Sequence, residues 1–276
     1  MIWSFRDRSV TLGRRPLVMG IVNVTPDSFS DGGRHSTADA AIEHALRLAA
    51  DGADFLDVGG ESSRPGAKPV SLDEELARVV PVIRGVVRQT DVPLSIDTTK
   101  AEVARQALQV GAAIVNDITA AGDPGMAEVV RQFSAGIVLM HMQGTPETMQ
   151  ANPTYQDVVS EVRDYLAGRV AALVASGVRA ERLAIDPGIG FGKTSAHNLT
   201  LLRELGQLQV MGRPVVLGVS RKGFVGEIAR RPVTERLAAS LAAACYCAAQ
   251  GTAQVLRVHD VAATVDAAKV IGAIAG

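Results

Sequence analysis

The chain has 276 residues, 47% of them hydrophobic, and its 28 Lys and Arg nearly balance 29 Asp and Glu, giving a formal net charge of −1. This balance argues against broad electrostatic binding of nucleic acid or anionic membrane, although it leaves room for a local basic pocket that binds a small anion. The length fits a single α/β barrel, and we expect one domain over residues 1–276.

Short apolar runs alternate with longer amphipathic stretches along the chain. The apolar runs are rich in Val, Ile and Leu without strict alternation, which is typical of parallel strands buried on both faces. They predict strands near residues 17–24, 55–60, 94–98, 114–118, 136–142, 183–189, 215–220 and 255–260. The amphipathic stretches predict helices over residues 37–50, 72–89, 100–110, 125–133, 158–176, 197–208, 234–250 and 261–274.

The repeated strand–helix order predicts an α/β fold of the closed (β/α)8 TIM barrel type. An open doubly wound sheet is the main alternative, but consecutive units without an antiparallel interruption favour closure. Residues 5–13 precede the repeat and have the pattern of a short N-terminal β-hairpin. We expect this hairpin to plug the N-terminal mouth of the barrel.

Cysteine usage and apolar run lengths indicate where the protein works. Cys245 and Cys247 flank Tyr246 in an alanine-rich predicted helix, where residues two apart face different sides. We therefore interpret both as small buried residues, neither metal ligands nor a disulfide. No run approaches the roughly 18 apolar residues of a membrane span, and Arg6 interrupts the apolar start of the chain. We expect a cytoplasmic protein.

Polar residues stand at the end of every predicted strand. In barrels of this kind the active site lies at the C-terminal ends of the strands. The residues there are, in order, Asn23, Gly59-Gly60-Glu61, Asp97-Thr98, Asn116-Asp117, His141, Asp186, Ser220-Arg221-Lys222 and Arg257-Val258-His259-Asp260. Any one set could cap a helix, but sets so varied in type and charge cannot all be caps. The sequence therefore predicts an active site at this end of the barrel.

These residues divide into an acidic side and a basic side. The acidic side consists of Asp97, Asn116 and Asp186. Its acceptors and single amide donor suit a flat heterocycle with amidine-like N–H groups. Arg257 and His259 lie two apart on the last strand and precede a helix N-terminus, which is a favourable place for phosphate. Asn23 joins this corner because the first and last strands are neighbours in a closed barrel.

Eight segments together resemble the dihydropteroate synthases along nearly the whole chain. They are Met19 to Gly33, Gly59 to Gly66, Ser95 to Lys100, Val115 to Asp117, Met140 to Gly144, Asp186 to Lys193, Gly218 to Lys222 and Arg257 to Asp260. Each segment is moderately specific, and their combination in this order is very specific. The family condenses 6-hydroxymethyl-7,8-dihydropterin diphosphate with 4-aminobenzoate to 7,8-dihydropteroate and pyrophosphate, in folate biosynthesis.

The resemblance implies a role for each matching residue. The pterin would contact Asp97, Asn116, Met140, Asp186, Phe191, Lys222 and Arg257. The aminobenzoate would contact Ser63, Arg64, Pro65 and Ser220. The diphosphate would contact Asn23, Ser63, Arg257 and His259, with Mg2+ bridging Asn23 and phosphate oxygens. The residues implied in catalysis are Asn23, Asp97, Lys222, Arg257 and His259.

The resemblance also implies a dissociative, SN1-like substitution, mobile loops and a homodimer. The diphosphate would leave from a CH2 group on an electron-rich dihydropterin, whose cation the amine of aminobenzoate then attacks. The loops near residues 24–36 and 61–70 would close over the site, and helix 234–250 is a candidate interface. Lid candidates without assigned chemistry are Asp27, Ser28, Phe29 and Asp31.

Other interpretations remain open. A barrel resembling a methyltetrahydrofolate methyltransferase would share the acidic side but would not need the basic corner. A non-catalytic paralogue should have lost one or more of the implied catalytic residues, and all are present. Ser63 stands where the family more often has threonine, which could change affinity for aminobenzoate or its sulfonamide mimics. His141 is interpreted as a wall group, and Glu74, Glu75 and Arg78 as a solvated helix face.

Overall fold

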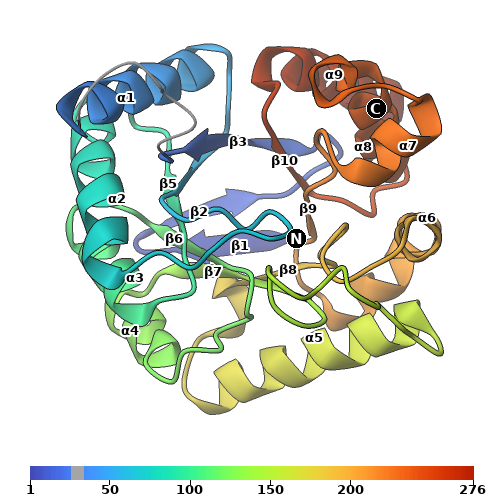
Figure 1. Ribbon diagram of the computed structural model, residues 1–276, viewed down its shortest axis with the longest axis horizontal. Helices are drawn as coiled ribbons and strands as arrows, with labels where there is room; N and C mark the ends of the chain where they lie inside the picture. The colour runs from blue at the N-terminus through green and yellow to red at the C-terminus, as the bar shows by residue number, and fades with distance from the viewer. Residues whose placement is uncertain (26–33) are drawn as a thin grey trace.

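The computed structural model describes residues 1–25 and 34–276. Its centre is an eight-stranded parallel sheet in the order β8-β7-β6-β5-β4-β3-β10-β9. Ile185 of β8 forms a parallel bridge with Val215, and its N–H donates to the Pro214 carbonyl at 2.9 Å. The two edges of the sheet therefore meet, which confirms the predicted barrel. In Figure 1 the helices surround the strands in chain order, from α1 in blue to α9 in red.

The described strands match the predicted runs. The barrel strands are β3 (Leu17–Asn23), β4 (Phe55–Gly59), β5 (Leu94–Asp97), β6 (Ile114–Asp117), β7 (Gly136–Met140), β8 (Leu183–Asp186), β9 (Val216–Leu217) and β10 (Val255–Val258). The hairpin strands are β1 (Ile2–Phe5) and β2 (Arg8–Thr11). Only β9 is much shorter than predicted. The chain leaves the sheet after Leu217 and turns at Arg221, whose φ is 56°.

One helix follows each barrel strand, except that both α7 and α8 follow β9. The helices are α1 (Arg34–Ala50), α2 (Leu72–Val86), α3 (Ala101–Gln109), α4 (Met126–Phe133), α5 (Val158–Ala175), α6 (Ser195–Arg203), α7 (Gly223–Ala229), α8 (Leu237–Ala249) and α9 (Val261–Ala275). Short 3-10 helices cover Ala180–Arg182, Leu205–Met211 and Val233–Glu235. The sequence prediction missed α7, which has only two turns and begins with a glycine. None of these helices is long and apolar enough to cross a membrane.

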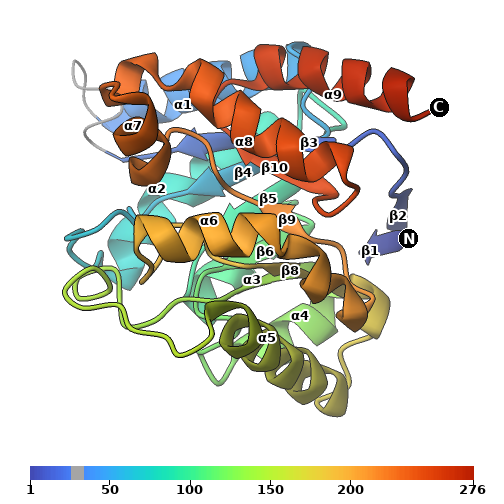
Figure 2. The ribbon, with the colours of Figure 1, turned by 90° about the vertical axis from the view of Figure 1, so that its right-hand side faces the viewer.

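The hairpin closes one mouth of the barrel. Trp3 and Phe5 of β1 are fully buried, and their rings lie 5.5 and 5.8 Å from the ring of Phe55 at the start of β4. The hairpin starts at Ile2, earlier than predicted, and its plugging position is confirmed. Figure 2 shows it at the right, with the loops that follow β4 and β7 at the opposite end. The N-terminal mouth is thus sealed, which leaves the C-terminal mouth for ligands.

The filling of the barrel changes from apolar to charged along its axis. Near the hairpin the interior is an apolar cluster that includes Met19, Phe55 and Ile114. Two residues further along β4, the fully buried Asp57 replaces the aromatic ring of Phe55. The charged layer therefore lies directly below the C-terminal mouth.

Candidate active site

Strand register brings the predicted strand-end residues to one rim. Asn23 pairs with Gly59, Gly59 pairs with Asp97, and Asp97 pairs with Asn116, across four neighbouring strands. On the other half of the barrel, Met140 pairs with Asp186. Residues in register lie at the same height in a parallel sheet. The side chains predicted from the sequence therefore meet around a common opening.

Arg257 lies between two carboxylates inside the barrel. Its Nε donates to Asp57 Oδ2 and its Nη2 donates to Asp97 Oδ2, both at 2.6 Å. Asp57 Oδ2 also accepts a hydrogen bond from Asn116 Nδ2 at 3.0 Å. The sequence assigned Arg257 both to the pterin and to the basic corner that binds the diphosphate. In the structure its guanidinium lies on the acidic side of the opening.

Burial and ion pairing have opposite effects on the pKa values of Asp97 and Arg257. Burial raises the pKa of Asp97 to about 7, against the pull of Arg257. Burial also works against the charge of Arg257, but Asp57 and Asp97 outweigh it and raise the pKa of the guanidinium. Arg257 therefore stays a cation at any working pH, and its charge is what holds two buried carboxylates together.

Asp57 is a site residue that the sequence reasoning missed. It is fully buried, and it joins Arg257 to Asn116, two residues that were predicted separately. The available signal was a single carboxylate inside the apolar run 55–60. A charge in a strand buried on both faces needs a partner, because an unpaired buried carboxylate is strongly destabilising.

Lys222 and Phe191 are in contact near Asp186. Lys222 Nζ lies 4.0 Å from the centre of the Phe191 ring. Burial lowers the pKa of Lys222 to about 8, and the nearby Asp186 carboxylate limits this fall. The ammonium is therefore charged near neutral pH and loses its proton in weakly alkaline solution.

The Asp186 loop is built to bring its backbone close to β7. Asp186 Oδ1 accepts the Gly188 N–H at 2.7 Å, while burial raises the pKa of Asp186 above its ordinary value. Gly188 has φ of +67°, and a Cβ there would lie 1.8 Å from the His141 carbonyl oxygen. Only glycine fits such a position. The turn therefore sets both the orientation of Asp186 and the path towards Phe191.

A buried lysine fastens the same loop. Lys193 Nζ lies 2.9 Å from His141 Nδ1 and donates to the carbonyls of Gly188 and Phe191, both at 3.0 Å. Burial and the neighbouring Lys193 lower the pKa of His141 to about 3. A neutral imidazole held this way is suited to a wall of the site and not to a general base at neutral pH.

His259 and Ser220 form a pair in the basic corner. Ser220 Oγ accepts the His259 backbone N–H at 3.2 Å and lies 3.0 Å from His259 Nδ1. The hydroxyl can either donate to Nδ1 or accept from it, depending on the tautomer of the ring. Burial, helped by Arg221 and Arg257, lowers the pKa of His259 to about 4. The His259 ring is thus neutral near pH 7.

The remaining predicted residues lie on loops around the opening. Ser63 is half-buried, whereas Arg64 and Pro65 are exposed. Gly66, in the same loop, donates its N–H to the Pro146 carbonyl at 3.0 Å, so loop 61–70 leans on the loop after β7. The lid candidates Asp27, Ser28, Phe29 and Asp31 lie outside the described residues.

The metal-binding capacity of the site is small. Within residues 1–25 and 34–276, no cluster of three or more His, Cys, Asp or Glu side chains is arranged to hold a metal ion. Asn23 ends β3 on the rim and is half-buried, so its amide oxygen offers one hard ligand. Mg2+ commonly takes one or two protein oxygens and completes its shell with water and substrate phosphates. The donor set therefore fits Mg2+ that a phosphorylated substrate helps to bind.

Known proteins share this sequence and this fold. The chain matches the family described as pterin binding enzyme over residues 19–259. It is 46% identical to dihydropteroate synthase of Escherichia coli K12 over 258 residues, covering 94% of this chain and 91% of that protein. It is 50% identical to the Neisseria meningitidis serogroup B dihydropteroate synthase over 263 residues, covering 93% and 92%.

Solved structures agree. The Yersinia pestis dihydropteroate synthase in a sulfonamide drug complex superposes with a TM-score of 0.93 at 43% identity, covering 100% of this chain and 99% of that one. The Xanthomonas albilineans dihydropteroate synthase in complex with 7,8-dihydropteroate gives a TM-score of 0.88 at 47% identity, covering 99% of each chain.

Proposed function

The chain belongs to the dihydropteroate synthases of the pterin-binding enzyme family, and on that premise we propose which residues carry out its reaction. The reaction joins 6-hydroxymethyl-7,8-dihydropterin diphosphate to 4-aminobenzoate, giving 7,8-dihydropteroate and pyrophosphate. The observation that carries the assignment is the ring of acceptors and cations around the C-terminal mouth, centred on Arg257 between Asp57 and Asp97.

The acidic side would bind the edges of the pterin. Asp186 and Asp97 would accept its N–H groups, Asn116 would both donate and accept, and Lys222 would donate to a ring acceptor. Among the described residues Arg257 uses only Oδ2 of Asp97, which leaves Oδ1 for a pterin N–H. The apolar faces of the ring would lie against Met140, which is 3% exposed, and against Phe191. The Arg257 guanidinium, held flat by its two carboxylates, would stack on a ring face.

The diphosphate would lie between the first and last strands. Asn23, Ser63, Arg257 and His259 are the donors that we assign to it. Because His259 is neutral, it would act through a hydrogen bond rather than as a charge, and the tautomer in which Ser220 donates to Nδ1 would leave Nε2–H free to donate to the diphosphate. Mg2+, held by Asn23 and the phosphate oxygens, would supply the positive charge that stabilises the departing group.

The chemistry needs no protein nucleophile. The bond between the pterin CH2 and the diphosphate oxygen breaks first, and its electron pair leaves with the diphosphate. The dihydropterin delocalises the resulting cation, which the Asp97 carboxylate stabilises from below. The aminobenzoate nitrogen then attacks the CH2 and loses a proton. Removing one preorganised charge contact of this kind typically lowers the rate by about 10²–10³-fold.

Aminobenzoate would bind at the outer rim. Arg64 would pair with its carboxylate, and Ser63, Pro65 and Ser220 would surround the ring. Ser220 is 7% exposed and is already oriented by His259, whereas Arg64 and Pro65 lie on the exposed loop. This half of the site therefore depends on how that loop is placed.

We also propose that the protein forms a homodimer in the cytoplasm. An apolar groove between α6, α7 and α8 contains the half-exposed side chains of Ile228 and Tyr246, which are 59% and 50% exposed. A groove of this kind marks an interaction surface, and a twofold pair of copies would cover the same groove on both subunits. Cys245 and Cys247 are both free thiols, as a reducing compartment favours.

Turnover by the purified protein tests the assignment. With Mg2+, 4-aminobenzoate and the pterin diphosphate, the protein should release pyrophosphate and form dihydropteroate in equal amounts. Chelation of Mg2+ should stop the reaction, and adding the ion back should restore it. Folded protein that gives no turnover with both substrates and Mg2+ would refute the proposed function.

A further inference from the structure

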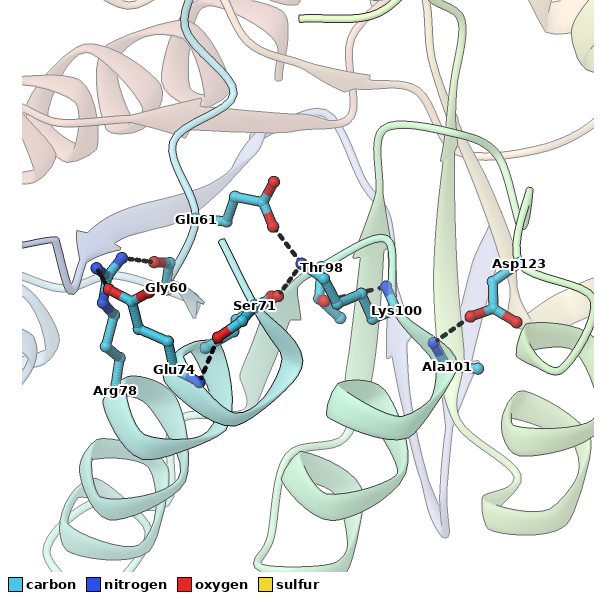
Figure 3. Close-up of polar contacts among 10 residues, drawn as sticks. Gly60, Glu61, Ser71, Glu74, Arg78, Thr98, Lys100, Ala101 and Asp123 are labelled. Atoms are coloured by element: carbon cyan, nitrogen blue, oxygen red, sulfur yellow. Dashed lines mark hydrogen bonds and ion pairs between the residues drawn. The ribbon is translucent and has the colours of Figure 1, made fainter. Parts of the chain in front are cut away.

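A partly buried ion-pair triad lies beside the opening but outside the substrate contacts. Glu61 follows β4, Glu75 lies on α2, and Lys100 directly precedes α3. Lys100 Nζ contacts Glu75 Oε2 at 2.6 Å and also pairs with Glu61 Oε2. Figure 3 shows the Lys100 ammonium reaching across to Glu61.

The two carboxylates of the triad differ in burial. The Glu75 side chain is fully buried, whereas the Glu61 side chain is 27% exposed. The sequence interpretation of Glu75 as part of a solvated face is therefore wrong, since α2 turns this residue towards the barrel. Glu75 Oε1 has no hydrogen-bond partner within the described residues, so Lys100 is its main compensation.

Lys100 is consequently a fixed cation. Burial disfavours its charge, but the hydrogen bonds to Glu61 and Glu75 outweigh burial and raise its pKa. The buried Glu75 holds the ammonium in place, and Glu61 docks on it from the start of loop 61–70. The Lys100 ammonium that Glu61 contacts is thus held in place by the buried Glu75 and not by loop 61–70.

A second contact fixes the residue before Glu61. Arg78 of α2 donates from Nη1 to the Gly60 carbonyl at 2.7 Å, as Figure 3 shows. A Cβ at Gly60 would lie 2.7 Å from Val79 Cγ1, so the chain here passes directly against α2. Ser63 and Arg64 follow Glu61 by only two and three residues.

We propose that Glu61 and Lys100 are positioning residues that set the affinity for 4-aminobenzoate by fixing the start of the loop that carries Ser63 and Arg64. This inference rests on the proposed function, in which that loop binds aminobenzoate. Neither residue touches substrate in this scheme. None of the residues assigned to the pterin ring lies on this loop, and Ser63 is the only one of the four assigned diphosphate donors that does, so the effect should fall mainly on aminobenzoate.

The main test is the variant Glu61→Gln, which keeps the size of the side chain and removes its charge. Loss of one charged hydrogen bond should raise the KM for 4-aminobenzoate by about tenfold. The KM for the pterin diphosphate should rise less, because Ser63 is the only one of its assigned donors on the loop. Because Glu61 is partly exposed and Glu75 keeps its cation, the unfolding temperature should be nearly unchanged.

Two further variants separate loop placement from a general effect. Glu128→Gln removes an exposed charge on α4, which pairs with Arg131 and does not contact the loop, and should leave both KM values unchanged. Lys100→Met should raise the KM for aminobenzoate as Glu61→Gln does and also lower the unfolding temperature, since it strips Glu75 of its cation. In the double variant the two increases in KM should not add, because both remove the same contact.

The outcomes distinguish this inference from the proposed function. If the parent turns over but Glu61→Gln leaves the aminobenzoate KM unchanged, the inference is wrong and the proposed function stands. Equal increases in both KM values would indicate a general structural effect and would also overturn it. A parent that gives no turnover refutes the proposed function, and the inference falls with it.

Discussion

Replacing Arg257 with methionine should destabilise the protein as well as inactivate it. The variant Arg257→Met keeps much of the side-chain volume but leaves Asp57 and Asp97 without their shared cation. Asp57 is fully buried and Asp97 is 14% exposed, so solvation by water cannot replace the lost ion pairs of either carboxylate. Removing one partner of such a buried pair typically costs about 3–5 kcal/mol.

The size of the protein converts this cost into a measurable shift. For domains of about 150–250 residues, 1 kcal/mol corresponds to about 2–4 °C in unfolding temperature, so the loss should be roughly 6–20 °C. The matched control is Arg221→Met, which breaks the pair with Asp260. Arg221 is 38% exposed, so that loss should be about 1 kcal/mol or less.

The loss of unfolding free energy in Arg257→Met, relative to the parent protein, should also depend on pH. Burial already raises the pKa of Asp97 to about 7 with Arg257 present, and removing the cation raises it further. The unfolded state is the same for both proteins, so the loss of stability changes only between the two folded pKa values of Asp97: it should shrink as pH falls from the raised value in the variant to about 7, and then level off. Denaturant unfolding at about pH 8 and about pH 5.5 measures it. A deficit under about 1 kcal/mol at the higher pH, or one that grows on acidification, would refute the reasoning.

Two further predictions concern Lys222 and the subunit interface. For Lys222, whose pKa is lowered to about 8, kcat/KM for the pterin diphosphate should fall as pH rises above about 8, because the free enzyme loses the charged donor. In Lys222→Arg the fall in kcat/KM should move to higher pH. If it stays at the same pH, the titrating group is not Lys222. For Ile228→Glu, a charge in the apolar groove should convert the dimer to monomers in light scattering, whereas Val210→Glu, at a 78% exposed position outside the groove, should leave a dimer.

The fold was predictable because its signals are local and repeated. Each buried strand is a short apolar run, and each run is followed by a polar residue and a helix. The errors fall where the chain departs from this repeat. The strand at 215–220 shrinks to Val216–Leu217, and α7 was missed because its two turns contain too few residues for a periodic pattern.

The candidate site was only partly predictable. Residues at strand ends, such as Asn116 and Asp186, share a height that register imposes, so the sequence alone could gather them. Asp57 lies in the middle of a strand, and its partner Arg257 is 200 residues away. No spacing rule connects them, because the link arises only when the barrel closes. Glu75 was misassigned for a related reason, since its cation Lys100 belongs to another unit of the repeat.

The charges inside the barrel bear on how a diphosphate binds there. Arg257 lies between the carboxylates of Asp57 and Asp97, and Lys222 lies near Asp186, so these carboxylates offset much of the positive charge inside the barrel. His259 adds nothing near pH 7, because its pKa is lowered to about 4. Of the arginines near His259, Arg257 and Arg221 are paired with carboxylates, so the positive charge of this corner is partly neutralised. A polyanionic substrate enters such a site favourably only when further positive charge accompanies it. Mg2+ bound between Asn23 and the phosphates would supply that charge, so binding of the diphosphate should depend more on Mg2+ than on any single basic side chain.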